Sequence, residues 1–337
     1  MKVALVALAL AWSHGVGAPP ERFTVAATGD FLIHSPVAAQ ALANGGGRRY
    51  DFRPMFGSIR TWITEADLAL CHVETPLVPG PVQGYPSFRT PPGLATSIRA
   101  VGWDACSTAS NHSLDAGSYG VKTTLDALDR AGLRHTGTAR SVRERRRPTI
   151  LTVKGSQIAF LSYTAVSNGQ AVPQPWSVNW ADARRILADA RRARRSGADT
   201  AIVNLHWGDE YVHEISPSQL SLARRLTRSP DIAAIVGQHV HVVQPIRWVN
   251  DKPVVFGEGN LVSNQTAACC PAESQDGLMA LLDFVAEDGR VRARRVRYVP
   301  TFVRHPDYRV VPARPGTLSW NRTVSTAGRR PRVKPVR

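Results

Sequence analysis

Short apolar runs that alternate with helical patterns are the feature that most restricts how this chain folds. Five of these runs read as β-strands and cover residues 23–27, 67–71, 103–107, 200–205 and 232–236. Strands that alternate with helices are typical of a parallel sheet covered by helices. Three later runs, at residues 253–256, 278–285 and 291–298, resemble hairpin strands and predict a second or mixed sheet. The predicted fold class is therefore α/β.

Helical segments are predicted between most of these strands. They cover residues 36–43, 55–65, 93–101, 118–132 and 180–195. Ser118 is the expected N-cap of its helix and Gly132 the expected end. Ser216 and Gln219 form a capping box with Pro217 at the first helical position, which predicts a further helix start. Residues 149–153 and 158–162 predict a hairpin.

Polar clusters follow five of the apolar runs directly. They are Gly29-Asp30, His72-Val73-Glu74, Ser110-Asn111-His112, His206-Trp207-Gly208-Asp209-Glu210 and Gln238-His239-Val240-His241. Imidazole, carboxylate and carboxamide groups seldom recur at the ends of buried strands unless those ends converge on a metal or a reacting anion. These clusters therefore predict a metal-centred active site.

The histidine pair is the strongest single signal. In an extended segment, His239 and His241 point to the same side, so their rings can share one metal or serve two neighbouring ones. The alternative is a pair of surface or core histidines. Asp30 follows a glycine and can reach a cation without a clash from its predecessor, although an isolated Gly-Asp pair is also common in turns.

The other clusters complete a mixed nitrogen and oxygen donor set. Asn111 offers a carboxamide oxygen as a ligand, and His112 can move a proton near neutral pH. His206 is a further candidate ligand, and Glu74 could bridge two cations. The structural alternatives are that Asn111 forms a turn at the start of a helix and that Glu74 is a buried carboxylate paired with an arginine. Together the set predicts one or two divalent ions, of manganese, iron, zinc or magnesium. A serine or cysteine triad fits less well, because Gly-x-Ser-x-Gly is absent.

The N-terminus resembles a secretory signal. At 337 residues the chain is long enough for one large α/β domain or two small ones. Residues 3–12 are apolar, follow Lys2 and are too short to span a bilayer. We therefore expect residues 1–18 to be a signal peptide and the protein to be extracytoplasmic. Pro19 disfavours cleavage after Ala18, so a retained anchor is the alternative.

Arginine carries almost all of the positive charge. The net charge is +16, and only five of the 42 basic residues are lysine. The basic runs lack the interleaved aromatic side chains that nucleic-acid binding needs, so we expect no nucleic-acid partner. A solvated basic surface is the simplest reading, and attraction to an anionic envelope polymer or membrane surface is the other.

Four cysteines are too few for a disulfide scaffold. Cys71 and Cys106 each lie near a strand end and would pair in an oxidising compartment if their strands are neighbours. The adjacent Cys269 and Cys270 would pair with each other only in a strained ring, or one of them could bond elsewhere.

Two segments lack strand or helix patterns. Residues 76–92 are rich in proline and glycine, which predicts a loop outside the core that overhangs the site. Residues 306–337 are rich in arginine and proline, which predicts a disordered tail.

Six segments, taken in order, resemble a known family. They are Thr28-Gly29-Asp30, Glu74-Thr75-Pro76-Leu77, Ser110-Asn111-His112 with Asp115 and Gly117, His206-Trp207-Gly208-Asp209-Glu210-Tyr211, Gly237-Gln238-His239-Val240-His241 and Phe256-Gly257-Glu258-Gly259-Asn260. Over residues 23–303 the chain is similar to CapA-type bacterial capsule synthesis proteins, which are associated with poly-γ-glutamate. That family resembles calcineurin-like metallophosphoesterases. The resemblance implies a four-layer α/β/β/α sandwich in a single domain over residues 22–305.

The resemblance also implies a function and a site. It implies an envelope protein of capsule biosynthesis, with an anionic polymer or a glutamyl compound as substrate and membrane-associated capsule machinery as a partner. As a metal-dependent hydrolase, the chain would use His112 and Asn111 in catalysis. The implied metal ligands are Asp30, Glu74, Asn111, His206, His239 and His241. A non-catalytic polymer-handling subunit and a phosphoesterase of a small substrate remain as alternatives.

Some positions depart from the family pattern. His72 stands where the family usually has asparagine, and Gln238 and Val240 replace the commoner histidine and proline. Leu32 stands where phosphoesterases usually have a histidine, and His34 comes two residues later. The site therefore either holds one metal or uses His72 or His34 as a substitute ligand.

Overall fold

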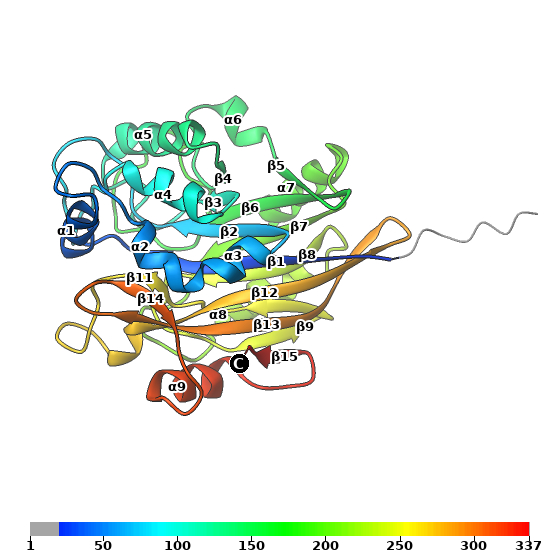
Figure 1. Ribbon diagram of the computed structural model, residues 1–337. Coiled ribbons are helices and arrows are strands. Elements are labelled where there is room, and N and C mark those ends of the chain that lie inside the picture. Colours follow the sequence, from blue (N-terminus) through cyan, green and yellow to red (C-terminus); the bar gives the residue numbers. More distant parts are fainter. Residues whose placement is uncertain (1–19, 337) are drawn as a thin grey trace, which may run out of the picture.

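The computed structural model describes residues 20–336, and Figure 1 shows their arrangement. The predicted signal peptide lies outside the described residues. Within residues 20–336 no helix is long and apolar enough to cross a membrane.

The first of the two sheets has nine strands and is mixed. Its main order is β14-β13-β12-β1-β2-β3-β4, with β11 (Asn260–Val262) paired to β1 and β15 (Val333–Pro335) paired to β13. The parallel strands are β1 (Glu21–Phe31), β2 (Leu68–Val73), β3 (Ala105–Ser107) and β4 (Arg134–Thr136). The antiparallel part consists of β12 (Asp276–Glu287), β13 (Arg290–Arg304) and β14 (Arg309–Pro312). The late runs at residues 278–285 and 291–298 therefore extend the first sheet and make it mixed, whereas the run at residues 253–256 lies in the second sheet.

The second sheet has six strands, in the order β5-β6-β7-β8-β10-β9. Its central parallel strands are β6 (Ser156–Thr164), β7 (Thr200–His206), β8 (Ile232–Gln238) and β10 (Lys252–Val255). The edge strands β5 (Thr149–Val153) and β9 (Ile246–Val249) pair antiparallel to their neighbours. The pairing of β5 with β6 confirms the predicted hairpin.

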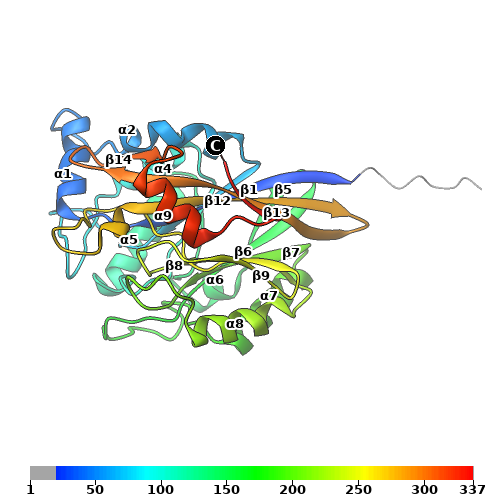
Figure 2. The same cartoon turned by 90° about the horizontal axis from the view of Figure 1, so that it is seen from below.

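The two sheets pack face to face between helices, as Figure 2 shows from below. Side chains alternate along β1, so Val25 and Ala27 lie in the core between the sheets while Ala26 faces the helices. The helices over the first sheet are α1 (Ser35–Asn44), α2 (Arg53–Phe56), α3 (Arg60–Glu65), α4 (Gly93–Val101) and α5 (Gly117–Arg130). The second sheet is covered by α7 (Ala183–Arg195) and α8 (Pro217–Thr227). The four-layer α/β/β/α prediction is confirmed.

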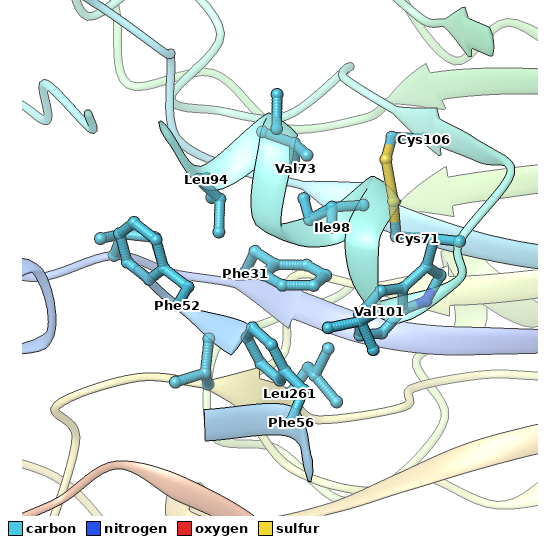
Figure 3. Close-up of a cluster of buried hydrophobic side chains, with 14 of the residues drawn as sticks. Phe31, Phe52, Phe56, Cys71, Val73, Leu94, Ile98, Val101, Cys106 and Leu261 are labelled. Atoms are coloured by element: carbon cyan, nitrogen blue, oxygen red, sulfur yellow. A yellow bond between two sulfur atoms is a disulfide. The ribbon is translucent and has the colours of Figure 1, made fainter. Parts of the chain in front are cut away.

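A disulfide joins two neighbouring strands of the first sheet. Cys71 of β2 lies opposite Cys106 of β3, and the two sulfurs are bonded, with the Cα atoms 4.5 Å apart. Both residues are buried in the cluster beneath α4, beside Ile98 (Figure 3). The predicted pairing is therefore present. Such bonds persist in oxidising compartments.

The helix termini follow the sequence signals in part. Ser216 accepts a hydrogen bond from the backbone of Gln219 and the Gln219 side chain accepts one from the Ser216 backbone, which confirms the capping box of α8. The predicted cap at Ser118 is wrong, because α5 begins at Gly117 and its N-cap, Ala116, makes no side-chain cap.

The predicted disorder of residues 306–337 is also wrong. After β14, the chain forms α9 (Leu318–Ala327) and β15 (Val333–Pro335). Ala327 and Val333 are buried in the core between the sheets. Each element contributes only one or two apolar side chains to that core, so no periodic pattern marked it. The domain therefore extends beyond residue 305.

Candidate metal centre

The site lies where strands of both sheets end. Asp30 lies in β1, His72 in β2 and His206 at the end of β7, and these three side chains are fully buried. The structure brings together all of the predicted site residues, which come from loops or strand ends. Besides Asp30 and His206 these are Glu74, Asn111, His112, His239 and His241, each no more than 6% exposed.

A close backbone contact sets the position of Asp30. The backbone N–H of Asp30 donates to the carbonyl of Gly259 at 3.1 Å. A Cβ atom on Gly29 would lie 1.9 Å from that same carbonyl oxygen, so only glycine fits there. The Asp30 carboxylate lies 3.3 Å from His241 Nδ1 through Oδ2 and 3.8 Å from His72 Nε2 through Oδ1.

A line of polar contacts runs from β2 and β3 to Asn111. Ser107 Oγ donates to the carbonyl of Cys71 at 3.1 Å and lies 2.7 Å from His72 Nδ1. His72 Nε2 lies 3.0 Å from His206 Nδ1. His206 Nε2 in turn lies 2.8 Å from Asn111 Oδ1. His72 is thus in contact with a predicted ligand.

Counting the protons along this line indicates where a cation fits. Burial lowers the pKa of His72 to about 4 and that of His206 well below its usual value, so each neutral ring carries one N–H proton. Because Ser107 donates to a carbonyl, His72 donates from Nδ1 to Ser107, and His206 donates from Nδ1 to His72. Because the Asn111 amide nitrogen donates to Asn168 Oδ1 at 3.1 Å, His206 Nε2 then directs a lone pair at the oxygen lone pairs of Asn111. A cation held by both atoms would remove this conflict.

Glu74 lies between two imidazoles. Its Oε1 is 3.9 Å from His206 Nε2 and 3.8 Å from His241 Nε2. Burial, and then the charge of Asp30, raises the pKa of Glu74 well above its usual value. Burial lowers the pKa of His241, but the carboxylates of Glu74 and Asp30 outweigh it and raise that pKa to about 9.

Several buried polar atoms of the site lack a hydrogen-bond partner among the described residues. They are Asp30 Oδ1, both carboxylate oxygens of Glu74, and Nδ1 of His239. Burial lowers the pKa of His239 to about 3, so this ring is neutral. Burying an unpaired carboxylate costs free energy unless a cation compensates its charge. The donor set of carboxylate, carboxamide and imidazole therefore fits a divalent cation.

The backbone of the histidine pair differs from the expected extended form. His239 has φ 92° and His241 has φ 58°, both in the left-handed region that non-glycine residues seldom adopt. Their rings nevertheless converge, with centroids 6.0 Å apart. The turn after β8, and not strand periodicity, brings the rings together. Such backbone strain is typical of functional sites.

Asn260 supports His241 and was not among the predicted site residues. Its Oδ1 lies 3.0 Å from His241 Nδ1. Its amide donates to Gln265 and to the carbonyl of Ser274, which fixes the orientation of the side chain. With Nδ1 engaged, His241 presents Nε2 toward Glu74. The motif around Asn260 was visible in the sequence, but its contact with His241 was not.

His112 is held by a buried carboxylate. His112 Nδ1 donates to Asp115 Oδ2 at 2.7 Å, which leaves Nε2 free to accept or give a proton. Asp115 also accepts from the backbone of Phe88 and the side chain of Gln170, each at 2.7 Å. The Phe88 ring packs edge-on against His112. Asp115 is thus a positioning residue that the sequence interpretation left without a role.

The loop at residues 76–92 is partly core. Leu77, Val78 and Phe88 are buried, which corrects the expectation of a loop outside the core, although Phe88 does reach the site.

His34 packs edge-on against Phe88 and lies outside every candidate metal-binding group found among the described residues. Gln238 donates to the buried carboxylate of Glu258 at 2.6 Å.

The candidate metal-binding groups overlap. Asp30, Glu74 and His241 form one group, and Asp30, His72 and His206 form another. A third joins the two histidines of the pair to Glu210, which is exposed. His72 orients His206 and is not itself a ligand in this arrangement, because its Nε2 accepts the Nδ1 proton of His206.

Comparison with known proteins assigns the family. The profile described as bacterial capsule synthesis protein PGA_cap matches residues 24–265. Capsule biosynthesis protein CapA of Bacillus anthracis is 25% identical over 283 residues, which make up 79% of this chain and 67% of that protein. PGA biosynthesis protein CapA of Bacillus subtilis (strain 168) is 30% identical over 172 residues, 50% of this chain and 44% of that protein. The chain thus spans about half to two thirds of these relatives.

Among solved structures, a novel phosphatase from Mycoplasma pneumoniae superposes with a TM-score of 0.51 at 10% identity. The superposition covers 86% of this chain and 96% of that one. At this identity the likeness concerns the fold alone. The profile match covers well over half of the chain and includes every predicted site residue. The chain therefore belongs to the bacterial capsule synthesis protein family PGA_cap.

Proposed function

We propose that this chain is an extracytoplasmic, metal-dependent hydrolase that acts on an anionic capsule polymer of the poly-γ-glutamate type during its biosynthesis. The observation that carries the proposal is the pair of buried carboxylates, Asp30 and Glu74, surrounded by imidazoles and left with unpaired oxygens. Carboxylates are seldom buried this deeply without a compensating cation, and no arginine or lysine among residues 20–336 forms an ion pair with either one.

Two overlapping sets of residues that share Glu74 could each hold an ion. Asp30, Glu74 and His241 form one set. Glu74, His206 and Asn111 form the other, with His239 packed against the His206 ring. Either one or two divalent ions would be held here. A divalent cation supplies electrostatic stabilisation of the charge that builds up on an oxygen during hydrolysis.

His112 is the proposed proton-transfer group. Its Nδ1 proton is held by Asp115, so Nε2 is the atom that would give a proton to a leaving group or take one from water. The buried Asp115 would stabilise the protonated ring during that transfer, as a carboxylate does beside a histidine base.

The proposed substrate class follows from the family and the charge. The relatives are described as capsule and PGA biosynthesis proteins. A net charge of +16 would attract a polymer of glutamate carboxylates. The disulfide between Cys71 and Cys106, together with the apolar N-terminal sequence, supports export. Membrane-associated capsule machinery is the proposed partner.

The test combines metal analysis with turnover. Purified protein is assayed for metal by mass spectrometry, and for hydrolysis of γ-glutamyl oligomers and of a phosphoester with and without a chelator. We expect bound metal and chelator-sensitive release of glutamate. A His135→Gln variant is the matched control, because His135 lies on β4 and pairs with Asp129 away from the site.

Two results would change the proposal. Polymer binding without turnover in the metal-loaded protein would favour a polymer-handling subunit. Turnover of the phosphoester alone would favour a small-molecule phosphoesterase.

A further inference from the structure

Two adjacent cysteines lie in the loop between β11 (Asn260–Val262) and β12. Both backbone N–H groups, of Cys269 and Cys270, donate to the carbonyl of Thr266, at 3.0 and 2.9 Å. This tight turn places the two sulfurs 2.6 Å apart, well inside the distance of ordinary non-bonded sulfur contact. Cys269 is exposed and Cys270 is half-buried.

A chain of direct contacts joins this pair to the metal centre. The Tyr211 hydroxyl donates to Cys270 Sγ at 3.9 Å and accepts from the Gln265 amide at 2.9 Å. Gln265 in turn accepts from Asn260 at 2.8 Å, and Asn260 contacts His241. The Tyr211 ring also lies beside His241, with centroids 5.9 Å apart. A change at Cys270 therefore reaches His241 by two routes, one through Tyr211 alone and one through Tyr211, Gln265 and Asn260.

We propose that Cys269 and Cys270 form a reversible vicinal disulfide, a modification site at the edge of the metal centre whose reaction partner is a small-molecule or protein disulfide. The Cys269 thiolate attacks one sulfur of the incoming disulfide, R–S–S–R, and releases one RSH. Cys270 then attacks the Cys269 sulfur of this mixed disulfide and releases the second RSH. Two electrons pass from the cysteine pair to the incoming disulfide, so the step is balanced.

The order of attack follows from exposure. Cys269 is accessible to solvent and attacks first. Burial raises the pKa of Cys270 to about 11, so only a small fraction of this thiol is the nucleophilic thiolate, which suits it to the second, intramolecular attack. Exposed or strained disulfides are more easily reduced than buried structural ones. The Cys71–Cys106 bond, which is buried, provides an internal comparison.

The first test measures thiols and masses in the intact protein. Reduced protein is titrated with glutathione disulfide under native conditions, and peptides are mapped after alkylation. We expect both thiols to disappear together without a retained glutathione adduct, and mild dithiothreitol to restore them while Cys71–Cys106 stays closed. In Cys270→Ser the adduct on Cys269 should persist. A stable adduct on wild-type Cys269, or two thiols that remain free, would overturn the proposal.

The second test measures coupling to the metal centre and rests on the proposed function. Mn²⁺ affinity is measured by calorimetry for the reduced and oxidised forms, with the Cys269→Ser/Cys270→Ser double variant as the control. We expect about a fivefold or larger difference between the two forms, the usual range for coupled sites, and none in the double variant under the same treatments. Equal affinities would overturn the coupling, whereas no Mn²⁺ binding by either form would overturn the proposed function itself.

Discussion

Two regions of this molecule bury carboxylates, and they differ in the groups that pair with them. Asp189 in α7 is 5% exposed and both of its oxygens are paired, with Arg145 at 2.8 Å, with Arg192, and with the Tyr163 hydroxyl at 2.9 Å. Asp30 and Glu74 are buried at least as deeply, yet no arginine or lysine forms an ion pair with them among residues 20–336.

The difference separates a structural carboxylate from two carboxylates that are candidate metal ligands. Arginine neutralises Asp189 permanently and contributes to packing. At the strand ends, imidazoles surround the carboxylates in place of arginine. His206 and His239 are neutral and present lone pairs, and His241 can release its second proton, which suits a cation that binds from solution. In a chain with 37 arginines, counted as 42 basic residues less five lysines, this exclusion of arginine is a strong sign of a metal centre.

The largest effect is expected from removing both site carboxylates. Asp30→Asn combined with Glu74→Gln keeps the shapes of the side chains but removes the negative charge that holds the ion. We expect divalent metal affinity to fall by at least about 100-fold, since loss of groups that merely support a ligand already costs about 10–100-fold. Calorimetry with Mn²⁺ and Zn²⁺ measures it. Unchanged affinity would mean that the ion, if any, binds elsewhere.

His112→Ala should lower turnover without removing metal. General acid–base catalysis typically contributes about 10²–10⁴-fold, so kcat should fall by that factor while the metal content stays at the wild-type value. Asp115→Asn should lower kcat less, because the ring remains but loses its fixed orientation. The measurement is steady-state hydrolysis beside metal analysis of the same samples. Metal loss in His112→Ala would show that this histidine is a ligand instead.

Asp189→Asn should damage stability and spare the site. Breaking a buried ion pair by removing one partner costs about 3–5 kcal/mol, because Arg145 and Arg192 lose their counter-charge. We expect the free energy of unfolding, measured by urea denaturation, to fall by about 3 kcal/mol, the lower end, since Arg192 is partly exposed. Metal affinity should stay within twofold of wild type. If metal binding fell with stability, the two carboxylate regions would not be independent.

The smallest effect concerns pH. Below its pKa of about 9, His241 in the metal-free protein carries a second proton on Nε2, the atom that faces Glu74. Metal binding must expel this proton, so affinity should rise by at least about tenfold per pH unit between pH 6 and pH 8. Calorimetry in buffers of different ionisation enthalpy would count the released protons. An affinity that does not vary with pH would exclude His241 as a ligand.

Local patterns in the sequence were sufficient for much of the fold. The helix Gly93–Val101 has the predicted bounds, and the capping box at Ser216 is present, because both depend on residues close in sequence. The strand ends could be predicted because the polar clusters follow apolar runs immediately. The fold itself was implied only by the resemblance, since packing of two sheets is not a local property.

The finer features of the site depended on contacts across the fold. His72 and Ser107 are 35 residues apart in the sequence, and the segments around these two residues gave no indication that they are in contact. The left-handed backbone of His239 and His241 comes from tertiary packing, so strand periodicity gave the wrong conformation. The C-terminal segment was misjudged for a similar reason, because Val310 is buried in a cluster with Phe56, and Val333 pairs with Val296, both far away in the sequence.

Anomalous diffraction from crystals grown with Mn²⁺ or Zn²⁺ would locate a bound ion directly. We expect a peak bound by Asp30, Glu74 and His241, with or without a second one at His206 and Asn111. The double variant Asp30→Asn/Glu74→Gln should lose the peak, and Asp189→Asn should keep it. Metal-loaded crystals that show no peak within bonding distance of Glu74 would contradict the account.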